Sequence, residues 1–386
     1  MLPPSNQADA TGPQPKEAGG LLTIDLDAIV ANWRIMKDRS GDAETAAVVK
    51  ADAYGCGISP VAEALAGAGC RTFFVAHPFE GRSARTVAPE AAIYVLNGLP
   101  LGTAETFAAA DLRPVLGSLE ELGEWRAFAK ANGWQGGAAL HIDTGINRLG
   151  LSVEEAIALA QGTAAARDGI TLLMSHLACA ETPAHPLNAK QLGLFLEMRA
   201  LFLGIPGSLA NSSGIFLGPD ALHDLVRPGV ALYGANPTPG HMNPMHPVVT
   251  LEGRIVQVRE IASGDSVGYG ATWIAARNSR IAIVSIGYAD GLLRSASSSG
   301  REPRAEVGFG DKRCPVVGRI SMDLFAVDVT DAHRVPARGD WVSLLDENFG
   351  VDELAAHAGT IGYEILTSLG HRYHRIYRSK AWASAR

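Results

Sequence analysis

Residues 46–67, AAVVKADAYGCGISPVAEALAG, contain the pattern that decides the fold. A short apolar run ends on Lys50, two glycines follow, and a helical segment begins near Ser59 and Pro60. An apolar run of this length, followed by a turn and then a helix, is typical of proteins with a parallel sheet. The segment therefore predicts one β/α unit, with a lysine at the end of its strand.

The same alternation repeats along the first half of the chain. Eight apolar runs resemble parallel strands, and helical signals such as serine N-caps and capping boxes lie between them. The runs are 46–50, 71–76, 92–96, 113–117, 138–143, 171–176, 207–212 and 225–234. Eight β/α units in about 200 residues predict a (β/α)8 barrel of the TIM type. A doubly wound open sheet competes with it, but the GxGxxG loop that usually follows its first strand is missing here.

The pattern changes at a proline-rich linker near 235–247. Beyond it, runs of β-branched residues alternate with glycine turns, which predicts a mostly antiparallel β domain. We expect the barrel to cover residues 21–238, including a lead-in strand at 21–26, and the β domain to cover 239–386. Residues 1–20 are rich in proline, glycine and polar types, and we expect a disordered tail there.

Composition argues against several functions. The chain has 386 residues, of which 47% are hydrophobic and 19% charged, and its net charge is −7, which argues against nucleic-acid binding. No run approaches the roughly 20 apolar residues of a membrane helix, and the first residues lack the apolar core of a signal peptide. Four cysteines without CxxC spacing favour reduced thiols over a zinc site or disulfides. We expect a cytoplasmic protein with no metal, no nucleic-acid partner and no membrane association.

Functional side chains gather at the predicted ends of five strands, which is where the active site of a (β/α)8 barrel lies. Each has an ordinary explanation alone, such as a solvated rim charge or a core histidine, but together they predict a site. The group comprises Lys50, Arg148, His176, Asn211 with Ser212, and Arg227 followed by Gly229 and Val230.

The lysine predicts carbonyl chemistry. Partial burial near arginines lowers the pKa of an amine, which can then form a Schiff base. A Schiff-base lysine alone suggests an aldolase. Together with backbone amides that hold a phosphate, it suggests pyridoxal 5′-phosphate, an electron sink for carbanions at Cα.

Nine motifs resemble those of the alanine racemase family. In the family's order they are AVVKADAYGCG, DTGINRLG, SHLACAE, NSSG, VRPGVALYG, GYGATW, IGYADG, GRISMD and GYEI, and the resemblance covers about 21 to 380. It implies a barrel with a β domain, pyridoxal phosphate as the cofactor, and interconversion of L-alanine and D-alanine for peptidoglycan or for catabolism. It also implies a head-to-tail homodimer with shared active sites.

The resemblance implies roles for single residues. Lys50 would form the aldimine and act as one catalytic base, and Tyr269 of the partner subunit would be the second. Two bases are needed because racemisation removes a proton from one face of Cα and delivers one to the other. Arg227 would bind the pyridine nitrogen, with His176 between it and the tyrosine. Arg148 would contact the phenolic oxygen of the cofactor and the substrate carboxylate.

The resemblance also implies roles for further residues. Asn211 belongs to the cofactor-binding set, and Met322 of the partner subunit would lie beside the substrate carboxylate. The phosphate cradle would comprise Tyr54, Ser212, Gly229, Val230 and Tyr363. The access route for substrate would be lined by Tyr288, Arg294, Arg319 and Asp323.

One position departs from the family pattern. Many members carry a carbamylated lysine two residues before the aspartate of the DTG motif, where it supports the arginine, whereas this sequence has His141. A carbamate is therefore not expected. Arg148 would instead be supported by a neutral His141, or by an anion bound to a protonated one.

Three alternatives share part of the pattern. A racemase of broad specificity would use the same chemistry in a larger pocket. A pyridoxal phosphate-dependent decarboxylase of the same fold would favour a carboxylate at the pyridine nitrogen, where this chain has Arg227. A cofactor carrier would consist of the barrel alone, which the additional β domain with Tyr269 argues against.

Overall fold

The computed structural model describes residues 12–163, 167–298 and 305–379, which divide into two compact units. Residues 29–232 and 236–245 form one, which we call the barrel unit. The described parts of 1–28, 233–235 and 246–386 form the other, which we call the β unit. Among the described residues, no helix is long and apolar enough to span a bilayer.

The strands of the barrel unit run parallel and close into a ring. Seven pair in chain order: β3 (Ala47–Val48), β4 (Thr72–Val75), β5 (Ala92–Val95), β6 (Arg113–Leu116), β7 (Ala138–His141), β8 (Ile170–Met174) and β9 (Gly207–Ser208). The eighth, β10 (Leu225–Val226), pairs with β2 (Glu44–Thr45), which leads into β3. The Arg227 amide donates to the Ala210 carbonyl at 2.9 Å, and the Val48 amide donates to the Pro228 carbonyl at 3.0 Å. These bonds join β10 to both neighbours, so the predicted (β/α)8 barrel is confirmed.

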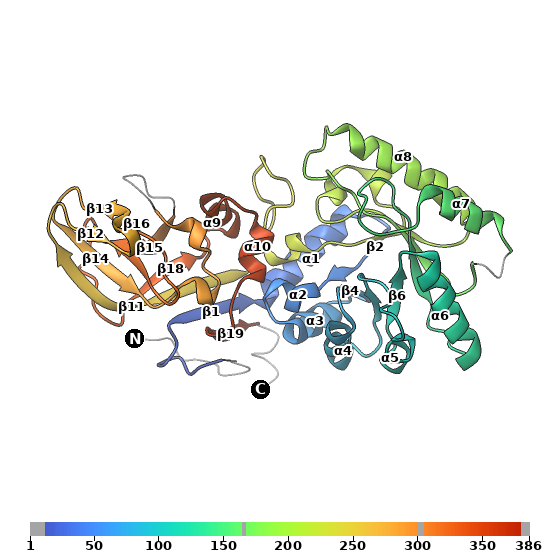
Figure 1. Ribbon diagram of the computed structural model, residues 1–386, viewed down its shortest axis with the longest axis horizontal. Coiled ribbons are helices and arrows are strands. Elements are labelled where there is room, and N and C mark those ends of the chain that lie inside the picture. Colours follow the sequence, from blue (N-terminus) through green and yellow to red (C-terminus); the bar gives the residue numbers. More distant parts are fainter. Residues whose placement is uncertain (1–11, 164–166, 299–304, 380–386) are drawn as a thin grey trace. The chain divides into compact units, whose positions relative to one another are not determined.

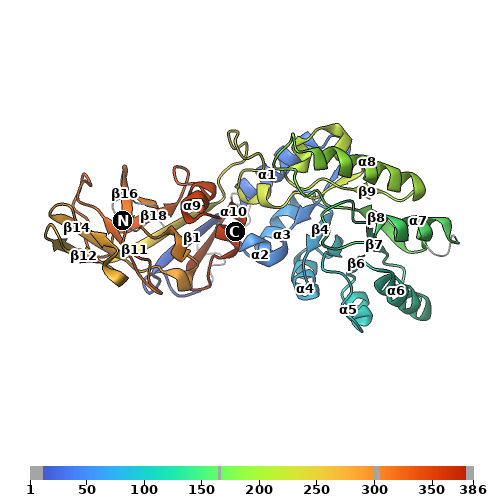
Figure 2. The same ribbon diagram turned by 45° about the horizontal axis from the view of Figure 1, so that its top comes forward.

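Helices connect these strands and cover the outside of the ring (Figures 1 and 2). Because both faces of the strands are covered, the strands are nearly continuous apolar runs, and Phe73, Phe74 and Leu140 are fully buried. The helices are α1 (Leu26–Arg39), α3 (Ile58–Gly67), α4 (Pro78–Val87), α5 (Ala104–Ala109), α6 (Leu119–Asn132), α7 (Val153–Gln161) and α8 (Pro186–Leu201).

The β unit is built on one sheet of order β14-β17-β16-β15-β18-β11-β1-β19. The long strand β11 (Val249–Ile261) pairs early with β1 (Gly20–Asp25) and β18 (Trp341–Leu345), and later with β14 (Ser279–Val284). Among the described strands of the β unit, only β1 and β19 (His374–Arg378) pair in parallel, so the predicted mostly antiparallel domain is confirmed. The remaining elements are β12 (Ser266–Val267), β13 (Trp273–Ile274), β15 (Glu306–Phe309), β16 (Lys312–Val317), β17 (Phe325–Asp328), α9 (Val351–Ala358) and α10 (Gly362–Thr367).

The N-terminal segment differs from the sequence expectation. The lead-in strand, expected as part of the barrel segment, is β1 and lies between β11 and β19 in the sheet of the β unit. Residues 12–19, expected in a disordered tail, contact the same unit: the Arg254 side chain donates to the Ala18 carbonyl at 3.1 Å, and Ala18 is buried. These partners lie 236 residues apart, so no local pattern could reveal the contact. Residues 1–11 lie outside the described residues.

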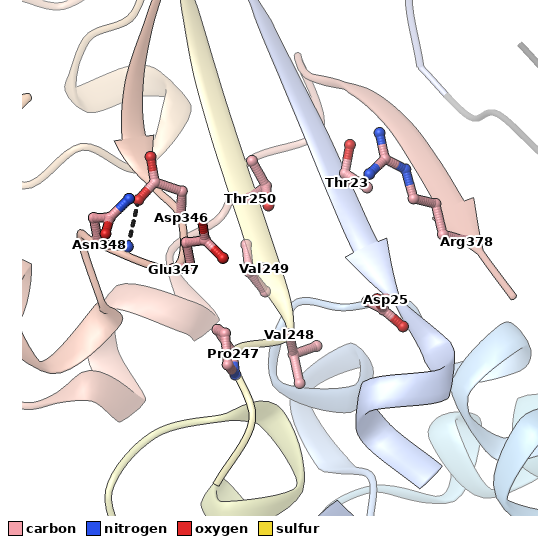
Figure 3. Close-up of a pocket in the computed structure, with 10 residues that line it drawn as sticks. All are labelled: Thr23, Asp25, Pro247, Val248, Val249, Thr250, Asp346, Glu347, Asn348 and Arg378. Carbon is pink, nitrogen blue, oxygen red and sulfur yellow. Dashed lines mark hydrogen bonds between the residues drawn. The ribbon is translucent and has the colours of Figure 1, made fainter. Parts of the chain in front are cut away.

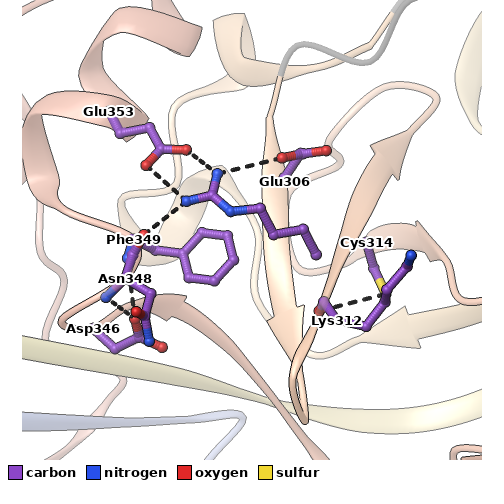
Figure 4. Close-up of polar contacts among 8 residues, drawn as sticks. Glu306, Lys312, Cys314, Asp346, Asn348, Phe349 and Glu353 are labelled. Carbon is purple, nitrogen blue, oxygen red and sulfur yellow. Dashed lines mark hydrogen bonds and ion pairs between the residues drawn. The ribbon is translucent and has the colours of Figure 1, made fainter. Parts of the chain in front are cut away.

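A charged cluster joins β15 and β16 to the start of α9. Arg313 pairs with Glu353 and, at 3.4 Å, with Glu306, and it donates to the Asn348 carbonyl at 2.8 Å (Figure 4). Its guanidinium also lies 4.3 Å from the centre of the Phe349 ring. Exposed ion pairs of this kind contribute roughly 0–1 kcal/mol, so the cluster is a modest tie between elements.

Candidate active site

Lys50 lies where β3 ends, at the start of one left-handed helical turn, α2 (Lys50–Tyr54). Four consecutive non-glycine residues, Ala51 to Tyr54, have φ of 53° or 54°, and the Ala53 amide donates to the Val49 carbonyl at 2.9 Å. Left-handed helical geometry costs L-residues roughly 1–2 kcal/mol each, or on the order of 4–8 kcal/mol for this turn. Such a turn persists only where the surrounding structure holds it.

The pKa of the Lys50 amine is lowered, as the sequence predicts. Burial is the larger cause and the charge of Arg148 adds to it, whereas the carboxylate of Glu80 acts in the opposite direction and raises the pKa. A lowered pKa increases the fraction of neutral amine, which is the form that attacks a carbonyl or accepts a proton.

Arg227 is buried and is held by neutral groups. It donates to the Ser208 hydroxyl at 2.5 Å, to the Ser175 carbonyl at 2.6 Å and to the Leu209 carbonyl at 3.3 Å, and it lies 3.4 Å from Nδ1 of His176. No carboxylate among the described residues pairs with it. Burial lowers the pKa of Arg227 to about 9, which leaves the guanidinium charged at neutral pH.

Two histidines beside this arginine are held neutral. Burial lowers the pKa of His176 well below its usual value, and the charges of Arg227 and Arg148 lower it further. Burial, followed by the charge of Arg227, lowers the pKa of His141 to about 4. Nε2 of His141 is buried and has no hydrogen-bond partner within the described chain. Of the two states considered for His141, the structure favours the neutral imidazole.

The barrel members of the predicted phosphate cradle lie together. The Ser212 hydroxyl accepts from the Gly229 amide at 2.9 Å and from the Ala231 amide at 3.3 Å. The Tyr54 hydroxyl is so near Gly229 that a Cβ added there would lie 2.4 Å from its oxygen. Val230 follows Gly229 and is buried. The hydroxyls and main-chain amides of this group form a cluster of hydrogen-bonding groups suited to an anion.

The loops that carry Arg148 and Asn211 are fixed by their own carboxylate and amide groups. Asp143 accepts from the amides of Gly145, Ile146 and Asn147 at 2.8–3.2 Å, which shapes the loop before Arg148. Arg148 is exposed and makes no hydrogen bond or ion pair in the described part of the chain. Asn211 accepts from the Gly214 amide at 2.8 Å through Oδ1. Its main chain forms an isolated parallel β-bridge with Arg227.

Predicted site residues of the β unit gather on three loops. The Tyr288 amide donates to the Ser321 carbonyl at 3.0 Å, next to Met322, and Arg319 lies against the glycine that follows Tyr269. The side chains of Tyr269, Met322 and Tyr288 are 70%, 53% and 42% exposed. The β unit therefore presents an apolar, tyrosine-bearing surface, defined here by these three side chains.

A second arginine holds two of these loops. Arg372 pairs with Asp290 at 2.6 Å and with Asp323 at 2.9 Å, and Asp290 is 5% exposed. The ion pair between Arg372 and Asp323 fixes this predicted access residue, and Arg372 itself lies outside the loops. Of the other predicted residues, Arg294 lies on a short turn, Arg294–Ala296, and Tyr363 lies in α10. Their roles stay predictions.

A pocket elsewhere in the β unit lies between β1, β11 and the residues after β18 (Figure 3). Its volume is about 310 Å³, and its charged lining comprises Asp25, Asp346, Glu347 and Arg378. No residue of the predicted site lines it, and the described residues contain no group of three metal-ligating side chains.

Two residues that the sequence analysis missed support the site. Glu80 accepts from the amide of Ala51, directly after Lys50, at 2.6 Å. Gln191 donates to the His176 carbonyl at 2.8 Å and accepts from the Ala178 amide at 2.9 Å. Neither lies in a motif, and both act from helices on strand-end loops.

The barrel residues fit pyridoxal phosphate. The partly buried amine of Lys50 suits a carbonyl group, and the cluster of hydroxyls and amides around Ser212 suits a phosphate. The buried guanidinium of Arg227, which pairs with no described carboxylate, suits a neutral ring nitrogen. These groups come from the ends of β3, β9 and β10 and the segments that follow them.

Sequence comparisons relate the chain to known proteins over most of its length. Two family profiles match the chain, "Alanine racemase, N-terminal domain" over residues 24–237 and "Alanine racemase, C-terminal domain" over 248–377. An alanine racemase of Methylobacterium sp. (strain 4-46) is 53% identical, covering 93% of this chain and 98% of that protein. A biosynthetic alanine racemase of Agrobacterium fabrum (strain C58) is 49% identical, covering 97% of this chain and 96% of that protein.

A solved structure has the same fold. The crystal structure of alanine racemase from Bartonella henselae, with covalently bound pyridoxal phosphate, matches with a TM-score of 0.88 at 40% identity. The match covers 94% of this chain and all of that one. The likeness therefore extends over both units.

Proposed function

The chain belongs to the alanine racemase family and is a pyridoxal phosphate-dependent racemase of L-alanine and D-alanine; from this premise we propose that Lys50 and Tyr269 of the partner subunit exchange the Cα proton. The observation that carries the assignment of Lys50 is its partly buried amine, whose pKa is lowered by burial and by Arg148. A neutral amine at working pH can accept a proton from one face of the substrate.

The barrel residues would hold the cofactor by its two ends. Tyr54, Ser212, Gly229 and Val230 would bind the phosphate, and Lys50 would bind the carbonyl carbon. When bound, pyridoxal phosphate supplies an electron sink that makes the Cα–H bond of an amino acid acidic. The charged Arg227, with no carboxylate partner in the described chain, supports racemisation over decarboxylation, which would favour a carboxylate at that place.

The other cofactor-binding residues would orient and tune these groups. A neutral His176 can accept a hydrogen bond from Arg227 through Nδ1, which lies 3.4 Å away, and leaves its second nitrogen for a tyrosine hydroxyl. The exposed Arg148 has its donors available for the substrate carboxylate, which a guanidinium can bind with two hydrogen bonds. Asn211 would complete the cofactor set.

The second base would come from a second copy of the chain. The 70% exposed Tyr269, beside the exposed Met322 and Tyr288, supports a homodimer, because a monomer leaves these apolar side chains in water. Met322 of the partner subunit would lie beside the substrate. Tyr288, Arg294, Arg319 and Asp323 would line the access route, and Tyr363 would join the phosphate cradle.

The assay incubates the protein with pyridoxal phosphate and L-alanine and follows D-alanine by an enantiomer-specific oxidase. We expect conversion by the natural chain and none by Lys50→Ala. Tyr269→Phe should slow exchange of the Cα deuteron for one enantiomer far more than for the other, because each base serves one face. Full activity in Lys50→Ala would contradict the assignment.

Hybrid dimers test the shared site. If Tyr269 acts across subunits, a dimer of one Lys50→Ala chain and one Tyr269→Phe chain contains one intact site and one doubly altered site. Unfolding and refolding a 1:1 mixture of the two inactive variants should restore about a quarter of the natural activity, because half of the dimers are hybrids with half of their sites intact. Sites confined to one chain would give no recovery.

We also propose a cytoplasmic location, supported by the four cysteines, all of which are free thiols and three of which are buried. Fractionation of cells that express the tagged chain tests this, and recovery from a periplasmic or membrane fraction would contradict it.

A further inference from the structure

Glu80 is a buried carboxylate that accepts three main-chain hydrogen bonds. Oε2 accepts from the Ala76 amide at 2.7 Å and from the His77 amide at 3.0 Å, and Oε1 accepts from the Ala51 amide at 2.6 Å. Only 5% of the residue is exposed, and it forms no ion pair with any described residue. The bonds on Oε2 cap its own helix, α4. The bond on Oε1 comes from Ala51, which follows the strand β3 of the preceding β/α unit. Capping of α4 does not require this bond.

We propose that Glu80 is a positioning residue of the active site, whose carboxylate holds the left-handed turn after β3 and thereby fixes Lys50 and Tyr54. The proposal rests on the proposed function, since Lys50 and Tyr54 are the residues assigned there to the two ends of the cofactor. Glu80 itself touches neither substrate nor cofactor in this scheme.

The turn is anchored to segments outside it. Ala51 is its first left-handed residue, and its amide is the one that Glu80 binds. The next residue, Asp52, is tied to the segment that follows the turn: it accepts from the Ile58 amide at 2.8 Å through Oδ1, and its carbonyl accepts from the Gly57 amide at 2.8 Å. Without such anchors, the four left-handed residues, Ala51 to Tyr54, would favour right-handed geometry. Without the Glu80 bond, the Ala51 amide loses the hydrogen bond that ties it to a neighbouring β/α unit.

The handedness of the turn determines where Tyr54 lies relative to Lys50. The two side chains leave from opposite ends of the turn, and the Tyr54 hydroxyl lies beside Gly229 in the phosphate cradle. A right-handed turn would rotate Tyr54 away from this place while Lys50 stays at the end of β3. The Glu80 carboxylate therefore sets the position of the Tyr54 hydroxyl, in the phosphate cradle, relative to the Lys50 amine.

The charge of Glu80 also acts on the amine. Of the charged groups that act on Lys50, Arg148 lowers its pKa and Glu80 raises it. Both oxygens of the carboxylate accept from main-chain amides. Glutamine at this position would retain one oxygen, but it would turn an NH2 group toward main-chain donors.

The chain contains a matched control two β/α units further along the barrel. Glu121 occupies the equivalent third position of α6, where it accepts from the Gly117 amide at 2.6 Å and from the Leu99 amide at 3.0 Å. It therefore also caps its helix and bridges two neighbouring strand-end loops. No residue of the proposed site is bound by it.

The experiment compares the natural chain, Glu80→Gln, Glu80→Asp and Glu121→Gln as full-length proteins. In the apoprotein, hydrogen exchange of the 49–57 peptide reports the turn, and the pH dependence of Lys50 acylation, read by mass spectrometry, reports the amine. Affinity for pyridoxal phosphate and turnover of L-alanine are measured on the same preparations.

We expect Glu80→Gln to speed exchange in the 49–57 peptide, to move the Lys50 titration to lower pH, and to weaken cofactor affinity or turnover on the order of 100-fold through misplacement. Glu80→Asp keeps the charge and the helix cap but shortens the reach to Ala51. It should speed exchange and weaken cofactor affinity with a smaller shift of the Lys50 titration, and it serves as the test if Glu80→Gln does not fold. Glu121→Gln should leave the peptide exchange, the Lys50 titration and the cofactor affinity unchanged.

The inference is overturned if the Glu80 variants match Glu121→Gln in peptide exchange, Lys50 titration and cofactor affinity, because Glu80 would then be only a helix cap. If the natural chain does not racemise alanine but the Glu80 variants still alter the turn and the Lys50 titration, the proposed function fails and the positioning role stands.

Discussion

Gly229→Ala tests the phosphate cradle at atomic scale. A Cβ at this position would lie 2.4 Å from the Tyr54 hydroxyl oxygen, whereas ordinary contact begins at 3.4 Å, so the hydroxyl must move by about 1 Å. Its carbon Cζ would lie at 3.2 Å, which needs only a small adjustment. The substitution therefore removes the hydroxyl from the cradle while the barrel strands remain in place.

The expected loss is that of one hydrogen bond to a charged group, about 1.5–3 kcal/mol, or roughly 10- to 150-fold in the Kd for pyridoxal phosphate. Tyr54→Phe should cost a similar amount because it removes the same group. In the Tyr54→Phe background, Gly229→Ala should then add little, because the oxygen that it displaces is already absent.

Fluorescence titration of the apoproteins with pyridoxal phosphate measures all four corners of this cycle. Pyridoxal, which lacks the phosphate, should bind the four proteins with similar affinity. Gly67→Ala is the control, because a Cβ there meets no atom within 4 Å. Unchanged affinity in Gly229→Ala, or losses that add in full in the double variant, would refute the proposed cradle.

Three further predictions concern stability. The folded-state pKa of His141, about 4, lies below its unfolded value of about 6.5, so the neutral form stabilises the apoprotein above pH 6.5 and this contribution is lost as the pH falls toward 4. In His141→Asn, urea unfolding at several pH values should therefore show a shallower acid loss, by about 3 kcal/mol at most, and an unchanged slope would contradict the buried neutral state. Ala51→Gly should stabilise the protein by about 1 kcal/mol, because glycine relieves the left-handed strain at this exposed residue. The control Ala127→Gly, at an exposed site in α6, should destabilise the protein by a similar amount. If thermal unfolding ranks the two variants in the opposite order, the turn is not strained. Arg372→Ala removes the half-exposed partner of the buried Asp290, which keeps its hydrogen bond from the Gly287 amide, and should cost about 1–3 kcal/mol in chemical unfolding. A loss below about 0.5 kcal/mol would mean that water replaces the arginine.

The barrel could be read from the sequence because its signals are local. Each strand is an apolar run of a few residues, and caps such as Ser152, which accepts from the Glu155 amide at 3.1 Å, mark where helices begin. The site residues of the barrel followed from that reading, because the ends of parallel strands must meet at one edge. Lys50, Arg227 and His176 were therefore predicted correctly to lie near one another.

The missed features depend on contacts between distant segments. Ala51 to Tyr54 contain no glycine, so no local rule predicts a left-handed turn there, and the carboxylate that holds it comes from Glu80 on another β/α unit. Residues 12–19 are polar and proline-rich, which resembles disorder, yet Arg254 of β11 binds them. Composition and local pattern describe a segment in isolation, whereas the structure of these two segments depends on residues that are distant in sequence.

The place of β1 has a consequence for how the chain folds during synthesis. β1 is made first, but its partners include Gly253 and His374, so at about 5–20 residues per second it waits roughly 10–50 s for the first of them. Residues 29–232 are complete within that time, and most barrel pairings join consecutive strands. The barrel can therefore form on the ribosome while β1 is still an unpaired edge, a state that favours aggregation. The yield of folded protein should therefore depend on the translation speed between residues 25 and 253, because that speed sets how long β1 stays unpaired.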